Sequence, residues 1–190
     1  VRALKVHSGK YKVTPGKPLP AALLQEDPEA VAAGAANLQR MIGIVQRTGI
    51  PAIVAINRFP QDTDRELDVI RGAARTADGV EVIEAFAKGG KGAEALATLV
   101  DQACQKPTTF RPFYDPTWPI TKKIETIARE VYGADGVDYS ERAEGQIQTY
   151  TRWGLDQLPI CMAKTHLSLS HDPHRKGAPT GFRIPIKEVR

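Results

Sequence analysis

Apolar and polar residues follow one another along the first half of the chain in blocks that predict strands and helices in turn. Pro51–Asn57 is a continuous apolar run, typical of a parallel strand covered on both faces, and Arg2–Val6 and Val80–Glu84 are shorter strand candidates. Helical spacing of apolar residues predicts three helices, at Asp27–Gly49, at Asp62–Thr76, and from the end of the glycine segment Gly89–Gly92 to about Lys106. This alternation predicts an α/β fold with a parallel sheet and flanking helices.

The helix boundaries have recognisable signals in the sequence. Asp27 precedes Pro28, which places an N-cap residue before a proline at the first helical position. Thr63 and Glu66 have the spacing of a capping box, in which each side chain binds the other residue's backbone N–H. Gly49 ends the first of these helices.

The second half of the chain has a different pattern. Thr108–Pro119 is rich in proline and aromatic residues and predicts an ordered linker. Helices are expected from Ile120 to Gly133 and over Ser140–Trp153, and strands at Leu158–Ala163 and Phe182–Ile186. We therefore expect residues 1–107 to form the main α/β domain, 108–119 a linker and 120–190 a smaller C-terminal α/β subdomain.

Composition is that of an ordinary globular protein, with 42% hydrophobic and 25% charged residues in 190. No apolar run approaches the roughly 18 residues of a transmembrane helix, so no membrane partner is expected. Cys104 and Cys161 fall in a predicted helix and a predicted core strand, which favours a reducing, cytoplasmic compartment. The chain begins at Val1 inside a predicted strand, which suggests a fragment or a chain whose partner segments lie elsewhere.

The positive charge of the chain is concentrated near its end. The net charge is +4, and the segment from Leu158 to Arg190, with six basic and two acidic residues, accounts for all of it. A local excess of this kind favours an anionic small molecule or phosphate over nucleic acid. The alternative is a solvated basic surface without a ligand.

Polar residues at the carboxyl ends of the predicted strands are the first candidates for a site, because open parallel sheets bind ligands there. Asn57 ends the most apolar strand and offers both a donor and an acceptor. Phe59 and Pro60 follow and offer a flat apolar face. The alternative is a turn in which Asp62 caps the next helix.

A glycine-rich segment follows the strand at Val80–Glu84. Gly89, Gly90 and Gly92 precede a helix and would present backbone N–H groups to an anion, to which Lys91 adds positive charge. The segment is not a Walker A motif, because Gly92 stands where Ser or Thr is required. The alternative is a tight turn between strand and helix.

Phe86 lies just before these glycines and could face Phe59, so that the two rings clamp a planar ligand. The alternative is that Phe86 is a core residue beneath the loop.

The polar loop after Ala163 is the third candidate. Lys164, Thr165 and Ser168 are predicted to make polar contacts with a ligand. The spacing of the loop's three histidines fits no familiar zinc pattern, so no metal site is expected. Ser168 also lacks an evident His/Asp partnership, and no catalytic nucleophile is assigned.

Six motifs occur together in an order that resembles the formate–tetrahydrofolate ligase family. They are Val1-Arg-Ala-Leu-Lys5, Ala55-Ile-Asn-Arg-Phe-Pro-Gln-Asp-Thr63, Gly89-Gly-Lys-Gly92, Tyr132-Gly-Ala-Asp135, Leu158-Pro-Ile-Cys-Met-Ala-Lys-Thr165 and Ser168-Leu-Ser-His-Asp-Pro173. The resemblance extends along essentially the whole chain.

The resemblance implies an ATP- and Mg²⁺-dependent ligase with a P-loop NTPase-like core, which joins formate to tetrahydrofolate through formyl phosphate. It places Phe59, Pro60 and Phe86 around the pteridine ring, and it suggests a homo-oligomer and a monovalent cation. In the family the position of Phe86 is often Trp, so the stacking face is kept and an indole N–H is lost.

The family's Walker A loop lies upstream of the region matched here, and this chain lacks it. We therefore expect the C-terminal part of a ligase, which needs the missing N-terminal part and is inactive alone. The alternatives are a non-catalytic folate- or nucleotide-binding module and a P-loop relative of another function. Nucleic-acid binding is disfavoured because the basic residues are dispersed.

Overall fold

The computed structural model describes residues 1–14 and 16–190. The chain forms two compact units, Val1–Arg111 and Pro112–Arg190, which are described separately. The division between them falls inside the segment rich in proline and aromatic residues. Both units combine helices with a small parallel sheet, so the α/β class predicted from the sequence is confirmed.

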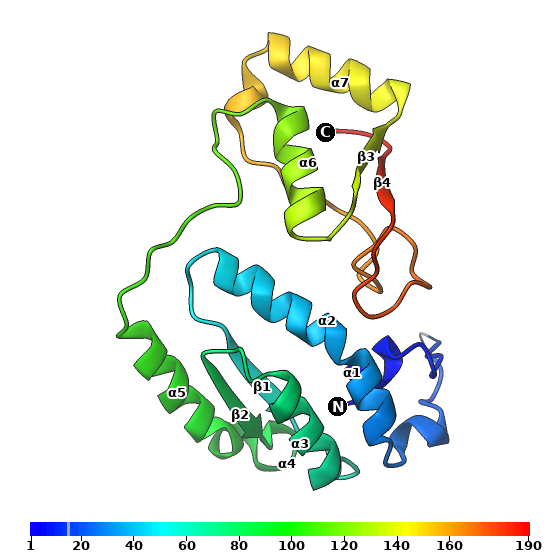
Figure 1. Ribbon diagram of the computed structural model, residues 1–190, viewed down its shortest axis with the longest axis vertical. Helices are drawn as coiled ribbons and strands as arrows, with labels where there is room; N and C mark the ends of the chain where they lie inside the picture. Colours follow the sequence, from blue (N-terminus) through cyan, green and yellow to red (C-terminus); the bar gives the residue numbers. More distant parts are fainter. Residues whose placement is uncertain (15) are drawn as a thin grey trace. The chain divides into compact units, whose positions relative to one another are not determined.

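The first unit contains a parallel pair of strands, β1 (Ile53–Asn57) and β2 (Gly79–Ile83), with Ile53 opposite Gly79 and Asn57 opposite Ile83. Three helices precede or connect these strands and two follow them (Figure 1). They are α1 (Arg2–His7), α2 (Pro28–Arg47), α3 (Asp64–Ala73), α4 (Ala85–Lys88) and α5 (Glu94–Cys104). Short 3₁₀ turns lie at Ala21–Leu24 and Gly89–Ala93.

Helices cover both faces of this pair of strands. On one face Ile56 packs with Leu4 of α1, Val31 of α2 and Leu67 of α3 in a buried apolar cluster. On the other face Leu99 of α5 lies against β2, and Figure 1 shows α2 and α5 on opposite sides of the strands. The coverage of β1 is less complete than expected, because Ala55 is exposed and β2 is its one neighbouring strand among the described residues.

The predicted helix starts of the first unit are confirmed. The Asp27 carboxylate accepts a hydrogen bond from the backbone N–H of Ala30 at 3.0 Å, with Pro28 in the first turn. Thr63 and Glu66 form the reciprocal capping box. Among the described residues, no helix combines the length and the apolar character needed to cross a bilayer.

The strand predicted at Arg2–Val6 is wrong, because this segment is the helix α1. A segment of six residues has little intrinsic preference, so its conformation depends on its tertiary contacts. The Leu4 carbonyl oxygen lies only 1.8 Å from the position that a Cβ would take at Gly34, so α1 packs directly on the backbone of α2. The side chain at position 34 therefore decides whether α1 can dock, which a local pattern does not reveal.

A fully buried ion pair joins α1 to α3. The Lys5 ammonium lies 2.5 Å from the Glu66 carboxylate and also donates to the carbonyls of Leu23 and Gln25. Burial alone would raise the pKa of Glu66, but hydrogen bonds from Lys5 and from the N–H groups of Asp27 and Thr63 outweigh it and hold that pKa below its ordinary value. Three separate segments, namely α1, the stretch from Leu23 to Asp27 and the start of α3, are thereby tied to one pair of charges.

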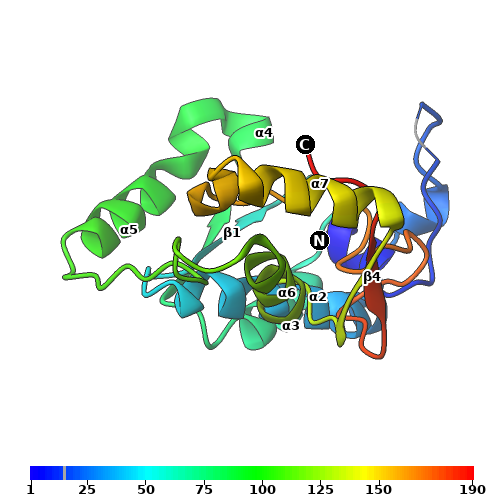
Figure 2. The same ribbon diagram turned by 90° about the horizontal axis from the view of Figure 1, so that it is seen from above.

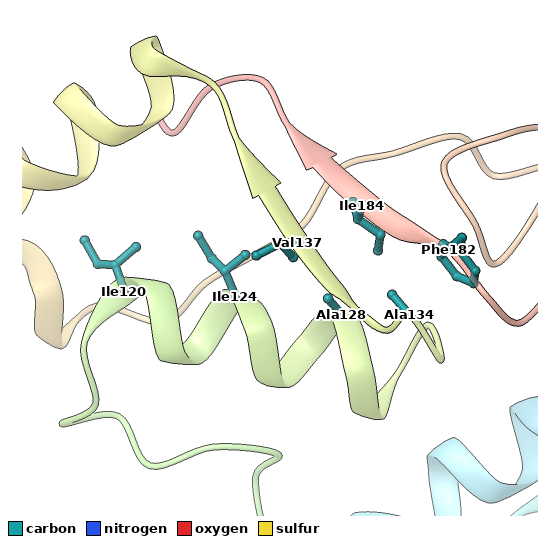
Figure 3. Packing of buried hydrophobic residues seen from close by; sticks show 7 residues of the cluster. All are labelled: Ile120, Ile124, Ala128, Ala134, Val137, Phe182 and Ile184. Carbon is teal, nitrogen blue, oxygen red and sulfur yellow. The ribbon is translucent and has the colours of Figure 1, made fainter.

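The second unit has the same kind of sheet on a smaller scale. Strands β3 (Gly136–Tyr139) and β4 (Arg183–Ile186) pair in parallel, and α6 (Ile120–Glu130) and α7 (Glu141–Arg152) precede and follow β3. Figure 3 shows α6 directing its apolar side chains toward β3 and β4. The buried cluster consists of Ile120, Ile124, Ala128, Ala134, Val137, Phe182 and Ile184.

The strand predicted at Leu158–Ala163 is wrong, and the sequence reasoning missed β3. Ile160 and Met162 do pack against the core, as an apolar run should, but Cys161 is exposed. Side chains rather than a neighbouring strand bind this backbone, since the Ile160 N–H donates to the Tyr114 hydroxyl and the Leu158 carbonyl accepts from Lys123. Apolar periodicity reports burial, and it does not say which segment finds a partner strand.

We predict that Lys5→Met lowers the free energy of unfolding of the first unit by about 3–5 kcal/mol, because it leaves the Glu66 carboxylate buried without its cation. The double variant Lys5→Met/Glu66→Leu should recover much of the loss, since it removes both charges and keeps the volume. Urea unfolding followed by circular dichroism measures both changes. Lys12→Met, at an exposed lysine, is the control, and equal stability of Lys5→Met and this control would contradict the prediction.

Candidate functional site

Two phenylalanine rings meet at the carboxyl ends of β1 and β2. Phe59 lies in the turn after β1 and Phe86 lies in α4, directly after β2. Their ring centroids are 5.2 Å apart and the ring planes are inclined by 46°. Phe86 is 70% exposed, so the alternative that it is a core residue beneath the loop is wrong. The two rings offer an accessible apolar surface at the strand ends, where parallel sheets bind ligands.

A tight turn holds Phe59 in place. The Asp62 carboxylate accepts from the Phe59 backbone N–H at 2.9 Å, and the Asp62 N–H donates to the Phe59 carbonyl. Pro60 lies in this turn and is exposed, as is Asn57 at the end of β1. Thr63, rather than Asp62, then caps α3, so the position of Phe59 is coupled to the start of that helix.

The two rings contact each other and leave no space for a planar ligand between them. A ring inserted between two parallel aromatic faces needs about 3.5 Å on each side, or about 7 Å in all. At 5.2 Å and with the observed tilt, one ring has to move before a ligand enters. Phe86 is the ring with freedom to do so, because it is exposed and its helix has only four residues.

The glycine-rich segment folds back on the end of β2. Gly89, Gly90 and Gly92 lie in the 3₁₀ turn Gly89–Ala93 together with Lys91, which is exposed. The Gly92 carbonyl accepts from the Glu84 N–H at 2.9 Å. A Cβ at Gly92 would lie 2.6 Å from the Glu84 carbonyl group, so glycine is required for this close approach. The geometry is that of a tight turn between the helices α4 and α5, which Figure 2 shows on either side of it.

The polar loop of the second unit is held together by its own side chains. The Lys164 ammonium donates to the carbonyls of Thr165 and Ser168, and it lies 4.8 Å from the centroid of the Tyr132 ring. Burial lowers the pKa of Lys164. The Ser168 hydroxyl donates to the Arg175 carbonyl and is itself buried, so it supports the loop from inside.

Lys164 and Thr165 also line a cavity of about 860 Å³ in the second unit. Its walls are residues 159–165 and 184–190, with Ile124 and His171. Ser168 is not among the residues that line it. The sequence reasoning missed the wall at 184–190, for which the only signal was the basic residues near the end of the chain.

The described residues hold no group of three or more His, Cys, Asp or Glu side chains that could bind a metal ion. Cys104 and Cys161 are both exposed free thiols, and Cys161 does not occupy the predicted core strand. The aromatic pair with its glycine turn in the first unit and the lysine loop in the second are therefore the candidate sites.

Comparison with known proteins identifies the family of this α/β chain. A model of the formate–tetrahydrofolate ligase family matches residues 1–190. The chain is 49% identical over 192 residues to formate–tetrahydrofolate ligase of Roseiflexus castenholzii, which covers 100% of this chain and 34% of that protein. It is 46% identical over 192 residues to the cytoplasmic C-1-tetrahydrofolate synthase of Homo sapiens, covering 100% of this chain and 20% of that protein.

The matched proteins carry the names of tetrahydrofolate ligases and synthases. The chain belongs to the formate–tetrahydrofolate ligase family, and the resemblance noted in the sequence is confirmed. It spans about a third of the length of the bacterial relatives it matches.

We predict that Gly92→Ala destabilises the turn beneath Phe86 by about 1–3 kcal/mol, because the added methyl group overlaps the Glu84 carbonyl. Gly90→Ala in the same turn is the matched control, since its Cβ would enter open space. Urea unfolding and the amide chemical shifts of residues 84–88 measure the difference. Indistinguishable behaviour of the two variants would show that the close approach at Gly92 is unimportant.

Proposed function

We propose that this chain is part of an ATP-dependent ligase that forms 10-formyltetrahydrofolate from formate and tetrahydrofolate through formyl phosphate. The observation that carries the proposal is the family match over the whole chain. The contact between Phe59 and Phe86 at the ends of adjacent parallel strands supports it, because it supplies aromatic surface for a planar ring.

The folate side of the reaction is assigned to the first unit. The pteridine ring stacks on Phe59 and Pro60, and Phe86 turns aside to admit the ring and then closes on it. The exposure of Phe86 and the short helix that carries it support this movement. Each stacking contact contributes about 0.5–1.5 kcal/mol beyond the area that it buries.

The anionic groups are assigned to polar and cationic residues. Asn57 and the turn Gly89–Ala93, with Lys91, lie at the same strand ends as the aromatic pair and form the nucleotide or anion side. Lys164 and Thr165 make polar contacts in the second unit, where they line the cavity. The sequence predicts the same kind of contact for Ser168. We assign Ser168 instead to the support of the loop, because its hydroxyl donates to the Arg175 carbonyl.

The phosphates of ATP and the Mg²⁺ that binds them are assigned to the Walker A segment outside this chain, while Asn57 and the glycine turn supply part of the nucleotide side. Among the described residues no group of three or more His, Cys, Asp or Glu side chains forms a ready-made metal site, and Mg²⁺ at nucleotide sites is held largely by substrate phosphates and water. The Walker A segment and any site for a monovalent cation are likewise assigned to the rest of the ligase, and the first unit is assigned to a portion of its P-loop NTPase-like core. The bacterial relatives, of which this chain covers 34%, have the length to contain them.

We further propose that residues 1–107 form the folate and nucleotide side, 108–119 the linker and 120–190 the smaller subdomain of a homo-oligomeric, cytoplasmic enzyme. The name of the human relative, a cytoplasmic synthase, supports the compartment. A non-catalytic folate- or nucleotide-binding module is the second candidate, because the aromatic pair at the strand ends can bind a planar ring without catalysis.

We predict that Phe59→Ala and Phe86→Ala each weaken tetrahydrofolate binding about tenfold, because each removes one stacking face. Anaerobic titration calorimetry on the 190-residue chain measures the change. Phe110→Ala is the matched control, since Phe110 is also exposed and lies outside the aromatic pair. Unchanged affinity in both site variants would exclude folate stacking at these residues.

A turnover assay separates the two candidate functions. The chain alone, given formate, ATP and tetrahydrofolate, should form no 10-formyltetrahydrofolate, and the chain joined to the remaining two thirds of a bacterial relative should form it. Binding without turnover in the joined protein favours the non-catalytic module. Turnover by the chain alone would overturn the assignment of the ATP phosphates to polypeptide outside it.

A further inference from the structure

One cation beside the aromatic pair has no role in the assignments above. The guanidinium carbon of Arg2 lies 4.0 Å from the centroid of the Phe59 ring, within the range of a cation–π contact. We propose that Arg2 determines specificity at this site, by favouring an electron-rich reduced pteridine over an electron-poor oxidised one. The inference rests on the proposed function, in which the pteridine stacks on Phe59.

Arg2 is fixed in relation to the ring. Its Nη2 donates to the Gln61 side-chain oxygen at 3.0 Å, and Gln61 belongs to the same turn as Phe59. At the other end, Arg2 opens α1, which the buried Lys5–Glu66 pair joins to α3. The cation and the ring are thus held by the same pair of segments.

The position of the guanidinium leaves one of its N–H groups without a hydrogen bond. The Nε atom of Arg2 is buried, and it is the one buried side-chain nitrogen or oxygen without a hydrogen-bond partner in the described part of the chain. Buried polar groups without partners are rare in proteins, because they lose water and gain nothing in exchange. The stacking contact with Phe59, together with the single hydrogen bond to Gln61, therefore accounts for the position of this side chain.

A cation over one face of a phenyl ring has an electronic consequence for the other face. It attracts π electrons toward itself, so the free face becomes less negative. The face that Arg2 covers is closed to a second ring, which leaves the less negative face for the ligand. That face stacks more favourably on a ring rich in electrons. Reduction converts imine nitrogens of the pteridine into electron-donating amines, which makes the tetrahydro form the richer ring.

The experiment compares tetrahydrofolate with folic acid, titrated separately under anaerobic conditions into the full chain and its variants. Arg2→Met removes the charge and keeps the length of the side chain. It should weaken tetrahydrofolate binding about five- to tenfold and folic acid binding less than twofold, so that the preference for the reduced ring falls. Arg2→Lys keeps the charge and should retain most of the preference.

Two further variants keep the test decisive. Gln61→Ala frees the guanidinium without removing it and should reduce the preference in the same direction, even if Arg2→Met folds poorly. Arg65→Met is the matched control, since Arg65 lies in the same unit as an exposed arginine paired with Glu26. It should leave both affinities unchanged.

The outcomes distinguish this inference from the proposed function. If the wild-type chain binds neither ligand, both fail together. If the wild-type chain binds and Arg2→Met and Gln61→Ala each weaken both ligands by the same factor, Arg2 is only structural and the inference alone is overturned. Unchanged affinities in Arg2→Met would overturn it equally.

Discussion

The buried ion pair of Lys5 and Glu66 is the interaction on which the first unit depends. One carboxylate binds the ammonium of α1, the N-terminus of α3 and the segment before α2, so that three helices share a single set of hydrogen bonds. A buried pair of this kind adds little net stability, because desolvation offsets the attraction between the charges. Its contribution is to specify which segments meet, and it thereby fixes the place from which Arg2 reaches Phe59.

A lysine that binds main-chain carbonyls recurs in the second unit. Lys123 is fully buried and donates to the carbonyls of Asp156 and Leu158, and Lys164 donates to two carbonyls of its own loop. Each ammonium carries three donors, so it can satisfy carbonyls that no strand or helix reaches. The hydrogen bonds from Lys123 allow the apolar segment after Leu158 to lie against the core with an irregular backbone.

The sequence predicted well where structure depends on local signals. The N-cap at Asp27, the capping box at Thr63 and the apolar strand after Pro51 are all encoded within a few residues. The meeting of Phe59 and Phe86 was also foreseen, because neighbouring parallel strands end at the same edge of a sheet.

Prediction failed where a distant residue decides the local structure. The conformation of Arg2–His7 depends on Gly34, and that of the segment after Leu158 depends on Tyr114 and Lys123. Neither partner leaves a signal in the segment that it controls. The sequence around Arg2 does not indicate its contact with Phe59 for the same reason, since that contact exists only once α1 has docked.

The contact between Phe59 and Phe86 competes with the binding of a planar ring at the same two side chains. The pair hides apolar surface from water when no ligand is bound, and a planar ligand has to replace that contact before it gains its own. The observed affinity is then the intrinsic affinity multiplied by the fraction of molecules in which the rings stand apart. Residues outside the aromatic pair, such as Gly92 in the turn that follows α4, influence this fraction. If the proposed function holds, the affinity for a planar ring can therefore change by substitution outside the aromatic pair, with Phe59 and Phe86 themselves unchanged.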